Sequence, residues 1–309
     1  MFRFIRAQAY IFVMIAAVLV GAFLPQAKIL SAGNTLFLQI IFFISCLRID
    51  LHLVYRYIKD WKFLLGANFL MLIGFPLIVW LVNMIYPSDL GFAIFILAAM
   101  PIGMTAPLLV ELAGLKNEST IVLTVTTALF APFTIPVLIK IFFGHTVDVP
   151  TADIFWQLVY VIILPFGLAT LVRLIPRFDS TKIDPFAKPV SLALLGLIIA
   201  GAIGKNARAG MALALDPIYL IAVLAVLYAF FAVTVLIGYY GLFWEPKDAR
   251  AGASVSLACM NFTLAIYLAS RFFPSPTIVL PIVVAIVPWA TVMPIWKNVL
   301  GKRIKLPAA

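Results

Sequence analysis

Long apolar runs recur along this chain, and they limit its possible folds more than any other feature. The run from Pro217 to Phe243, for example, contains no charged residue. About 20 consecutive apolar residues are enough for a helix to cross a bilayer. Because hydrocarbon offers no partner for backbone N–H and C=O groups, only helices or a closed barrel can span it. The length of these runs favours helices, so the sequence predicts an all-α integral membrane protein.

We expect about ten transmembrane helices, with five in residues 1–150 and five in residues 151–309. An odd number of helices reverses the second half in the membrane, so the two halves are predicted to be inverted repeats. The predicted spans are Gln8–Leu24, Thr35–Leu47, Phe63–Ile85, Leu90–Ala113, Thr120–Phe143, Ile154–Ile175, Pro189–Ile203, Pro217–Phe243, Ala251–Phe272 and Ile278–Trp296.

The basic residues predict the orientation of these spans. The chain has 22 Lys and Arg residues, and 17 of them fall on the side of the N-terminus. By the positive-inside rule we expect both termini in the cytoplasm and the protein in the plasma or inner membrane. We expect no nucleic-acid partner, because the net charge of +10 is spread over short loops rather than gathered on one face. The expected partners are the bilayer and a small solute, and the oligomeric state is left open.

Few residues suit catalysis or metal binding. Cys46 and Cys259 lie inside apolar runs, and His52 and His145 have no nearby catalytic or metal-ligand set. No ionisable residue lies near the middle of a span, which argues against proton coupling and against an enzyme. The segment Ile49 to Lys62 alternates apolar and basic residues, and it is either a short interfacial helix or a linker.

The fourth span contains a predicted break. Pro101, Gly103 and Pro107 lie within seven residues, so helix hydrogen bonds are lost around Thr105. Discontinuous helices of this kind bind solute near the midplane of repeat-built transporters. The alternative is a proline kink that binds no ligand.

The ninth span offers the matching polar stretch, from Ser254 to Thr263. It contains Ser256 and Asn261, and a buried amide in hydrocarbon needs hydrogen-bond partners. Asn261 is therefore predicted to contact solute, or else to join two helices. In the fifth span Thr120 and Thr124 lie one turn apart on one face. Their hydroxyls are candidates to ligate a cation or solute, with bonding to the preceding turn as the alternative.

Four motifs resemble those of the bile acid:sodium symporter family. The first half carries Pro101-x-Gly103-x-x-Ala106, Leu112-Ala113 and Thr120-x-x-x-Thr124, and the second half carries Met260-Asn261-x-x-Leu264-Ala265. The resemblance implies a panel of helices one, two, six and seven beside a core of helices three, four, five, eight, nine and ten. Helices four and nine would cross, and solute would bind beside the crossing.

This chain departs from the family pattern at the sodium ligands. The family glutamate falls on Ser256, and a glutamine four residues later falls on Met260. The serine–asparagine pair of the fourth helix falls on Ala106 and Pro107, and the third-helix glutamine falls on Met71. A hard cation needs several oxygen ligands. Na⁺ is thus the only candidate cofactor, as a coupling ion, and the sequence argues against it.

A second resemblance is to the arsenite efflux carriers of the same superfamily, through Asn261-Phe262-x-Leu264-Ala265-Ile266. Thr263 replaces their glutamate, and the fourth span has no cysteine for a soft arsenic centre.

Together these features predict a secondary transporter for a small organic anion or an amphipathic carboxylate, and not an enzyme. The alternatives are a membrane binding or sensor protein on the same scaffold, or an efflux carrier related to arsenite exporters. The predicted solute-binding residues are Asn261, Thr105, Thr263, Ser254, Pro101 and Pro107. The predicted ion-binding residues are Thr120, Thr124 and Ser256.

Overall fold

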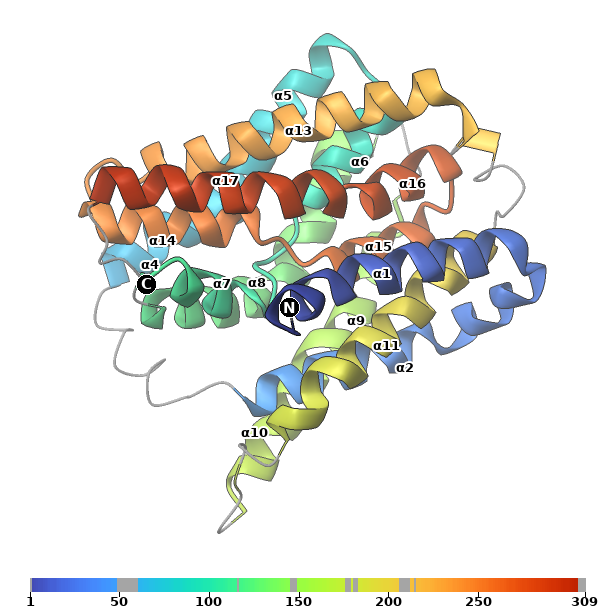
Figure 1. Ribbon diagram of the computed structural model, residues 1–309, viewed down its shortest axis with the longest axis horizontal. Coiled ribbons are helices and arrows are strands. Elements are labelled where there is room, and N and C mark those ends of the chain that lie inside the picture. Colours follow the sequence, from blue (N-terminus) through green and yellow to red (C-terminus); the bar gives the residue numbers. More distant parts are fainter. Residues whose placement is uncertain are drawn as a thin grey trace. The chain divides into compact units, whose positions relative to one another are not determined.

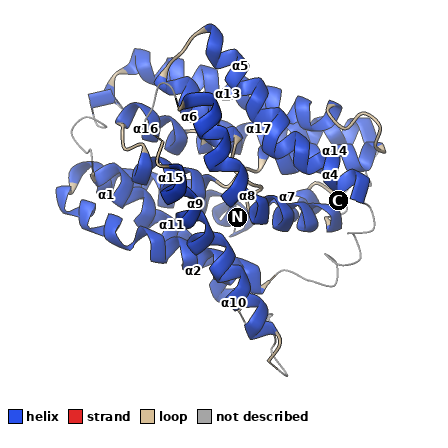
Figure 2. Cartoon of the chain, turned by 180° about the vertical axis from the view of Figure 1, so that it is seen from behind, coloured by secondary structure: helices blue, strands red, loops and turns tan. Residues whose placement is uncertain are grey.

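The computed structural model describes residues 2–48, 61–115, 117–144, 149–175, 179, 183–205, 212–213 and 215–304. The regular structure of these residues is helical, as Figure 2 shows, and the extended pairing is a single isolated bridge between Ile102 and Met260. The predicted interfacial segment Ile49 to Lys62 lies almost wholly outside the described residues.

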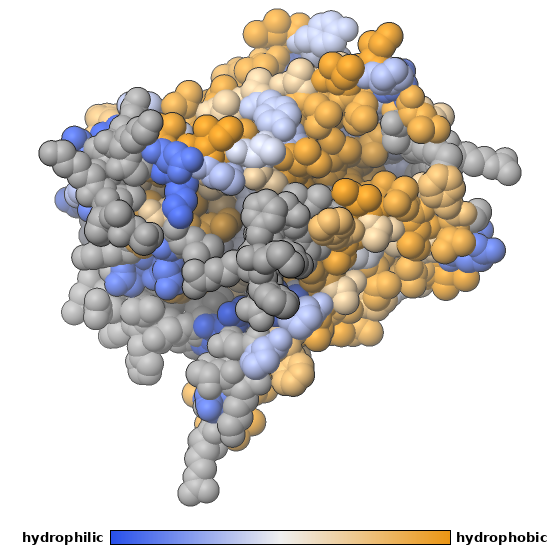
Figure 3. Space-filling view, in the orientation of Figure 1, coloured by the Kyte–Doolittle hydropathy of each residue, from blue (hydrophilic) through white to orange (hydrophobic). Residues whose placement is uncertain are grey.

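Within the described residues, seven helical stretches are long and apolar enough to cross a membrane. This confirms an all-α membrane protein. The stretches are Gln26–Leu47, Trp61–Ile85, Glu118–Phe143, Thr151–Arg173, Pro185–Gly204, Pro217–Tyr240 and Pro276–Leu300. On the face shown in Figure 3 much of the coloured surface is orange, as expected for side chains that contact lipid.

The chain divides into two compact units, and each is described by itself. Unit 1 comprises Met1–Ile49, Ala152–Ile221 and Thr263–Val283. In it α11 packs against α1, η1 and α2, and α10 packs against α2. Its elements, shown in Figure 1, are α1 (Phe2–Phe23), the 3₁₀ helix η1 (Pro25–Gly33), α2 (Asn34–Leu47), α9 (Thr151–Leu158), the π-helix η3 (Val159–Ile163), α10 (Leu164–Arg173), α11 (Asp184–Gly204), α15 (Phe262–Phe272) and α16 (Pro276–Val284).

Unit 2 comprises Asp50–Thr151, Ala222–Phe262 and Val284–Ala309. In it α14 packs against α7, α8 and α17. Its elements are α4 (Trp61–Phe69), the π-helix η2 (Leu70–Gly74), α5 (Phe75–Ile85), α6 (Asp89–Ala98), α7 (Ala106–Leu112), α8 (Glu118–Phe143), α13 (Pro217–Tyr240, from its sixth residue), α14 (Lys247–Ala258) and α17 (Ile286–Ile304).

Prolines accompany three of the changes in regular helix structure. The two π-turns end at Gly74 and Ile163, two residues before Pro76 and Pro165, and these prolines have no N–H to donate to the preceding turn. The predicted tenth span, Ile278–Trp296, lies within the apolar stretch Pro276–Leu300, and that stretch is interrupted at Ala285, between the end of α16 at Val284 and the start of α17 at Ile286. The cause is Pro288, because it cannot donate to the carbonyl of Val284.

The predicted second span, Thr35–Leu47, agrees with α2, which begins at Asn34 and ends at Leu47. The helical stretch already includes η1, because Pro25 begins a 3₁₀ helix that leads directly into α2. The polar residues Gln26, Lys28 and Ser31 give this segment the composition of a loop, which hid the helix from the hydrophobic pattern.

Candidate functional site

Two predicted spans are interrupted within unit 2, and the interruptions meet. The predicted fourth span is divided between α6, which ends at Ala98, and α7, which begins at Ala106. The predicted ninth span is divided where α14 ends at Ala258, before the next helix begins at Phe262. The first break follows from Pro101 and Pro107, which remove backbone donors. The second has no proline or glycine between residues 254 and 263.

Backbone hydrogen bonds join the two breaks directly. The Gly103 N–H donates to the Cys259 carbonyl at 2.6 Å, and the Asn261 N–H donates to the Pro101 carbonyl at 2.9 Å. These bonds form the antiparallel bridge between Ile102 and Met260, both of which are buried. Unpaired backbone groups are very unfavourable in hydrocarbon. Each break therefore stabilises the other by supplying partners for its backbone groups.

Gly103 permits this close approach. A Cβ at this position would lie 3.0 Å from the Met260 carbonyl oxygen and 3.1 Å from the Cys259 carbonyl oxygen. Both distances are shorter than an ordinary van der Waals contact, and both atoms belong to the backbone, which cannot rotate away. Glycine is therefore required because two backbone segments cross closely here, and not because of an unusual φ angle.

A row of buried threonines on α8 runs beside the crossing. Thr120, Thr124 and Thr127 are spaced by four and three residues, which places them on one face of the helix. The Thr127 hydroxyl oxygen accepts a hydrogen bond from the Ile102 N–H at 3.2 Å. It also donates to the Leu123 carbonyl at 2.7 Å. Thr127 thus fixes the first break against α8.

At the other end of this row, Thr120 pairs with Ser256 of α14. Their hydroxyl oxygens are 3.0 Å apart, and the Ser256 hydroxyl also lies 2.7 Å from the Gly252 carbonyl, to which it donates. Since a hydroxyl has one hydrogen, Thr120 is the donor between the two side chains. Thr124 donates to the Thr120 carbonyl at 2.8 Å, which is the bonding to the preceding turn considered above. All three hydroxyls therefore have protein partners.

The other predicted residues lie in different settings. Asn261 is buried, with 7% of its surface exposed, whereas Thr105 is exposed in the turn before α7 and Pro107 is the second residue of that helix. Ser254 is fully buried and accepts a hydrogen bond from the indole N–H of Trp296 at 2.8 Å, which ties α14 to α17. Thr263 is half-buried in α15 and belongs to unit 1.

Sequence reasoning missed two polar residues of unit 2 and a polar cluster of unit 1. Thr127 was identifiable from its spacing to Thr120 and Thr124. Asn68 is a buried amide in an apolar run, and it donates to the Leu64 carbonyl at 2.8 Å and to the Thr126 hydroxyl at 3.0 Å. An amide within a predicted span is the signal that could have identified it.

The polar cluster of unit 1 joins α2, α9 and α15. The buried hydroxyl of Tyr267 lies 2.8 Å from the Thr35 hydroxyl, and the Gln157 amide donates to both oxygens. A fourth polar side chain, Gln39, donates to the Tyr160 carbonyl at 3.0 Å and adds a second link between α2 and the helix that begins as α9. These bonds hold α15 within unit 1.

Seven apolar stretches, with buried hydroxyls and a backbone crossing between two interrupted helices, define a multi-pass membrane protein. Residues 35–213 match the model of the Sodium Bile acid symporter family, and the chain belongs to that family. This confirms the resemblance found in the motifs of the fourth and fifth spans. The family is one of symporters, in line with the prediction that the chain is not an enzyme. The ninth-span motif that contains Asn261 lies outside the matched residues.

Two curated relatives carry the same name in two subspecies of rice. The "Probable sodium/metabolite cotransporter BASS5, chloroplastic" of Oryza sativa subsp. indica is 29% identical over 174 residues. The protein of that name from Oryza sativa subsp. japonica is also 29% identical over 174 residues. The match covers 54% of this chain and 42% of each relative, so the chain spans less than half the length of these relatives.

Proposed function

We propose that this protein is a secondary transporter that moves a small organic anion or amphipathic carboxylate across the membrane by alternating access. Its ten helices would form two inverted repeats, residues 1–150 and 151–309. Helices one, two, six and seven would form the panel, and helices three, four, five, eight, nine and ten would form the core. The solute would bind beside the crossing of the fourth and ninth helices. Both termini would lie in the cytoplasm.

The observation that carries this proposal is the backbone crossing in unit 2. Two interrupted helices exchange hydrogen bonds through Gly103, Cys259, Pro101 and Asn261. Paired interruptions place backbone groups and helix ends in the interior of a membrane protein, where an ordinary helix presents only side chains. A protein that only anchors or scaffolds has no need of such a feature.

The chemistry around the crossing favours an anionic or neutral polar solute. The groups beside it are hydroxyls and an amide, from Thr120, Ser256, Thr127 and Asn261. In the described helices every Asp and Glu lies in the first or last turns, so a cationic solute would find no carboxylate in the middle of a span. Within unit 2, the solute would lie next to Asn261 and Thr105, with Ser254, Pro101 and Pro107 completing the site.

We further propose that transport does not use the sodium sites of the family. The Thr120 and Ser256 hydroxyls bond each other and the Gly252 carbonyl, which satisfies both without a cation. Two neutral oxygens fall far short of the oxygen ligands, at least about five or six, that a hard cation takes. Thr124, already bonded to the preceding turn, adds no carboxylate. The rice relatives are named as sodium/metabolite cotransporters, and this chain would differ from them in coupling.

The first experiment is a thermal-shift screen of the purified protein against organic anions, each in sodium and in potassium, because a bound ligand raises stability by mass action. The best ligand is then tested for counterflow in proteoliposomes. Equal stabilisation in both salts together with counterflow supports the proposal. A ligand that binds without counterflow would indicate a sensor, and stabilisation only in sodium would overturn the proposed loss of sodium coupling.

A further inference from the structure

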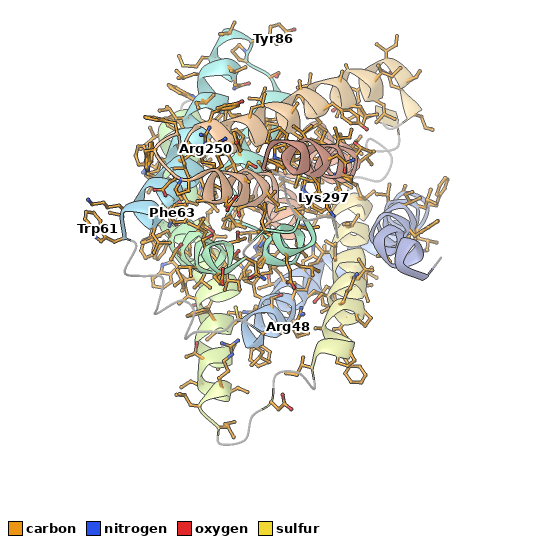
Figure 4. The ribbon with its side chains drawn as sticks, turned by 60° about the vertical axis from the view of Figure 1, so that its left-hand side comes forward. Arg48, Trp61, Phe63, Tyr86, Arg250 and Lys297 are labelled. Carbon is orange, nitrogen blue, oxygen red and sulfur yellow. The ribbon has the colours of Figure 1, made fainter. Side chains whose placement is uncertain are left out.

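One end of unit 2 gathers cations and aromatic rings where α13 ends and α14 begins. Arg250 lies in the first turn of α14, and its Nε donates to the Tyr239 carbonyl at 2.8 Å. Its guanidinium carbon lies 4.4 Å from the centre of the Tyr239 ring and 5.5 Å from that of Tyr240. Figure 4 labels Arg250, together with Trp61 at the start of α4. The guanidinium is therefore held in one orientation by stacking and by one hydrogen bond.

This geometry leaves part of the arginine available. The hydrogen bond to the Tyr239 carbonyl uses only Nε of Arg250. The two terminal nitrogens of an arginine can bind a phosphate or carboxylate through two parallel hydrogen bonds. The nearest acids along the chain are Glu245 and Asp248, and neither forms an ion pair with Arg250 in the described part of the chain. A fixed and incompletely paired guanidinium is suited to an anion.

Two lysines extend the positive charge around Arg250. Lys247 precedes Arg250 by three residues on α14, which places the two on one face of that helix. Lys62 lies one turn before Gly66 on α4, and Gly66 lies against the indole of Trp244, where an added Cβ would be 3.0 Å from the ring. Trp244 therefore brings the start of α4 to the α13–α14 corner. The corner thus combines charges from two segments that are distant in sequence.

Exposed aromatic side chains surround these cations. Trp61 is 58% exposed, Trp244 55% and Tyr240 48%. Exposed tryptophan and tyrosine at the ends of transmembrane helices lie at the level of the lipid headgroups. Since α4, α13 and α14 have their ends here, the cations lie at the depth of lipid phosphates rather than in the hydrocarbon or in bulk water.

We propose that the α13–α14 corner and the start of α4 form a binding site for an anionic phospholipid, with Arg250 as the bidentate ligand of its phosphate. Lys247 and Lys62 attract the net negative headgroup, and Trp244 and Tyr240 contact the glycerol and upper acyl region. Charge complementarity selects the anionic lipid, because a zwitterionic headgroup brings its own cation. The site is separate from the crossing of the interrupted helices and does not depend on the identity of the solute.

Native mass spectrometry of the full-length protein tests this site, with phosphatidylglycerol and phosphatidylcholine of the same acyl chains as probes. The parent is expected to bind phosphatidylglycerol more tightly. Arg250→Lys keeps the charge but loses the planar pair of donors, so it should weaken phosphatidylglycerol binding about tenfold. Lys247→Gln, at an exposed residue, should weaken it about fivefold without affecting folding. Lys28→Gln in unit 1, with the same change of charge, should leave binding unchanged.

Each arm of the test can overturn the proposal. Equal phosphatidylglycerol binding by the parent and Arg250→Lys would show that only general positive charge matters, as would equal losses in Lys247→Gln and Lys28→Gln. Displacement of the lipid by millimolar inorganic phosphate would indicate a site for a free phosphate rather than a lipid. If Arg250→Lys melts well below the parent, the Lys247→Gln and Lys28→Gln pair decides the outcome.

Discussion

The substitution Gly103→Ala tests whether the crossing of the two interrupted helices depends on close backbone approach. The added carbon would lie 3.0 Å from the Met260 carbonyl oxygen, 3.1 Å from the Cys259 carbonyl oxygen and 3.4 Å from the Met260 carbonyl carbon. One of the two backbone segments must therefore move by a few tenths of an ångström. That movement also lengthens the 2.6 Å hydrogen bond from the Gly103 N–H to the Cys259 carbonyl.

The expected loss can be estimated from these contacts. Forcing one extra methyl group into a well-packed interior costs about 1–3 kcal/mol. A weakened backbone hydrogen bond adds up to about 1 kcal/mol. A total near 2 kcal/mol corresponds to a decrease of about 5 °C in melting temperature for a chain of this size. The assay is a thermal melt in detergent at a fixed scan rate, because unfolding of such a protein is generally irreversible.

Gly252→Ala is the matched control. Gly252 is also a buried glycine of unit 2, but a Cβ there would have only the Thr120 hydroxyl oxygen near it, at 3.9 Å. That is an ordinary contact, and alanine is the better helix former, so we expect a melting temperature within about 1 °C of the parent or above it. The reasoning fails if Gly103→Ala melts with the parent, or if Gly252→Ala is equally destabilised.

Three further predictions follow from the described contacts. Asn261→Ala should weaken solute binding at least tenfold while folded yield changes little, and loss of folded protein would instead support a role in joining helices. Thr120→Ala and Ser256→Ala should show a coupling of about 1 kcal/mol in a double-mutant cycle of thermal melts, and additive effects would contradict the hydroxyl pair. Tyr267→Phe leaves the Gln157 amide without one of its acceptors and should cost about 1–3 kcal/mol in the same assay, and a parental melt would show that this bond contributes nothing.

The sequence predicted helices well because hydrophobic length is a strong and local signal. It also predicted the first break, since Pro101 and Pro107 remove donors whatever surrounds them. Helix ends were harder. The 3₁₀ helix before α2 contains polar residues, and the interruption of the tenth span at Ala285 depends on a proline three residues later. The local composition was compatible with either a loop or a 3₁₀ helix before α2, and with either a continuous or an interrupted helix at Ala285.

The candidate site was predictable only where residue type and spacing act together. The i, i+4 spacing of Thr120 and Thr124 identified a buried face of α8, and Thr127 extends it. The pairing of Thr120 with Ser256 joins residues that are 136 positions apart, and no local pattern contains that information. The same is true of Ser254 and Trp296, whose hydrogen bond fixes α14 against α17.

The break in the ninth span shows that the backbone crossing does not depend on the side chains that would bind an ion. Residues 254–263 contain neither proline nor glycine, so nothing local interrupts the helix there. Its free backbone groups bond to Pro101 and Gly103, so this break depends on contacts with the fourth span rather than on its own sequence. These bonds use main-chain atoms and one glycine, and none of them requires the acidic and amide side chains that the family resemblance assigns to sodium. A chain can therefore keep the crossing while Ser256 and Met260 stand at those positions, and membership of the family does not by itself determine the coupling ion.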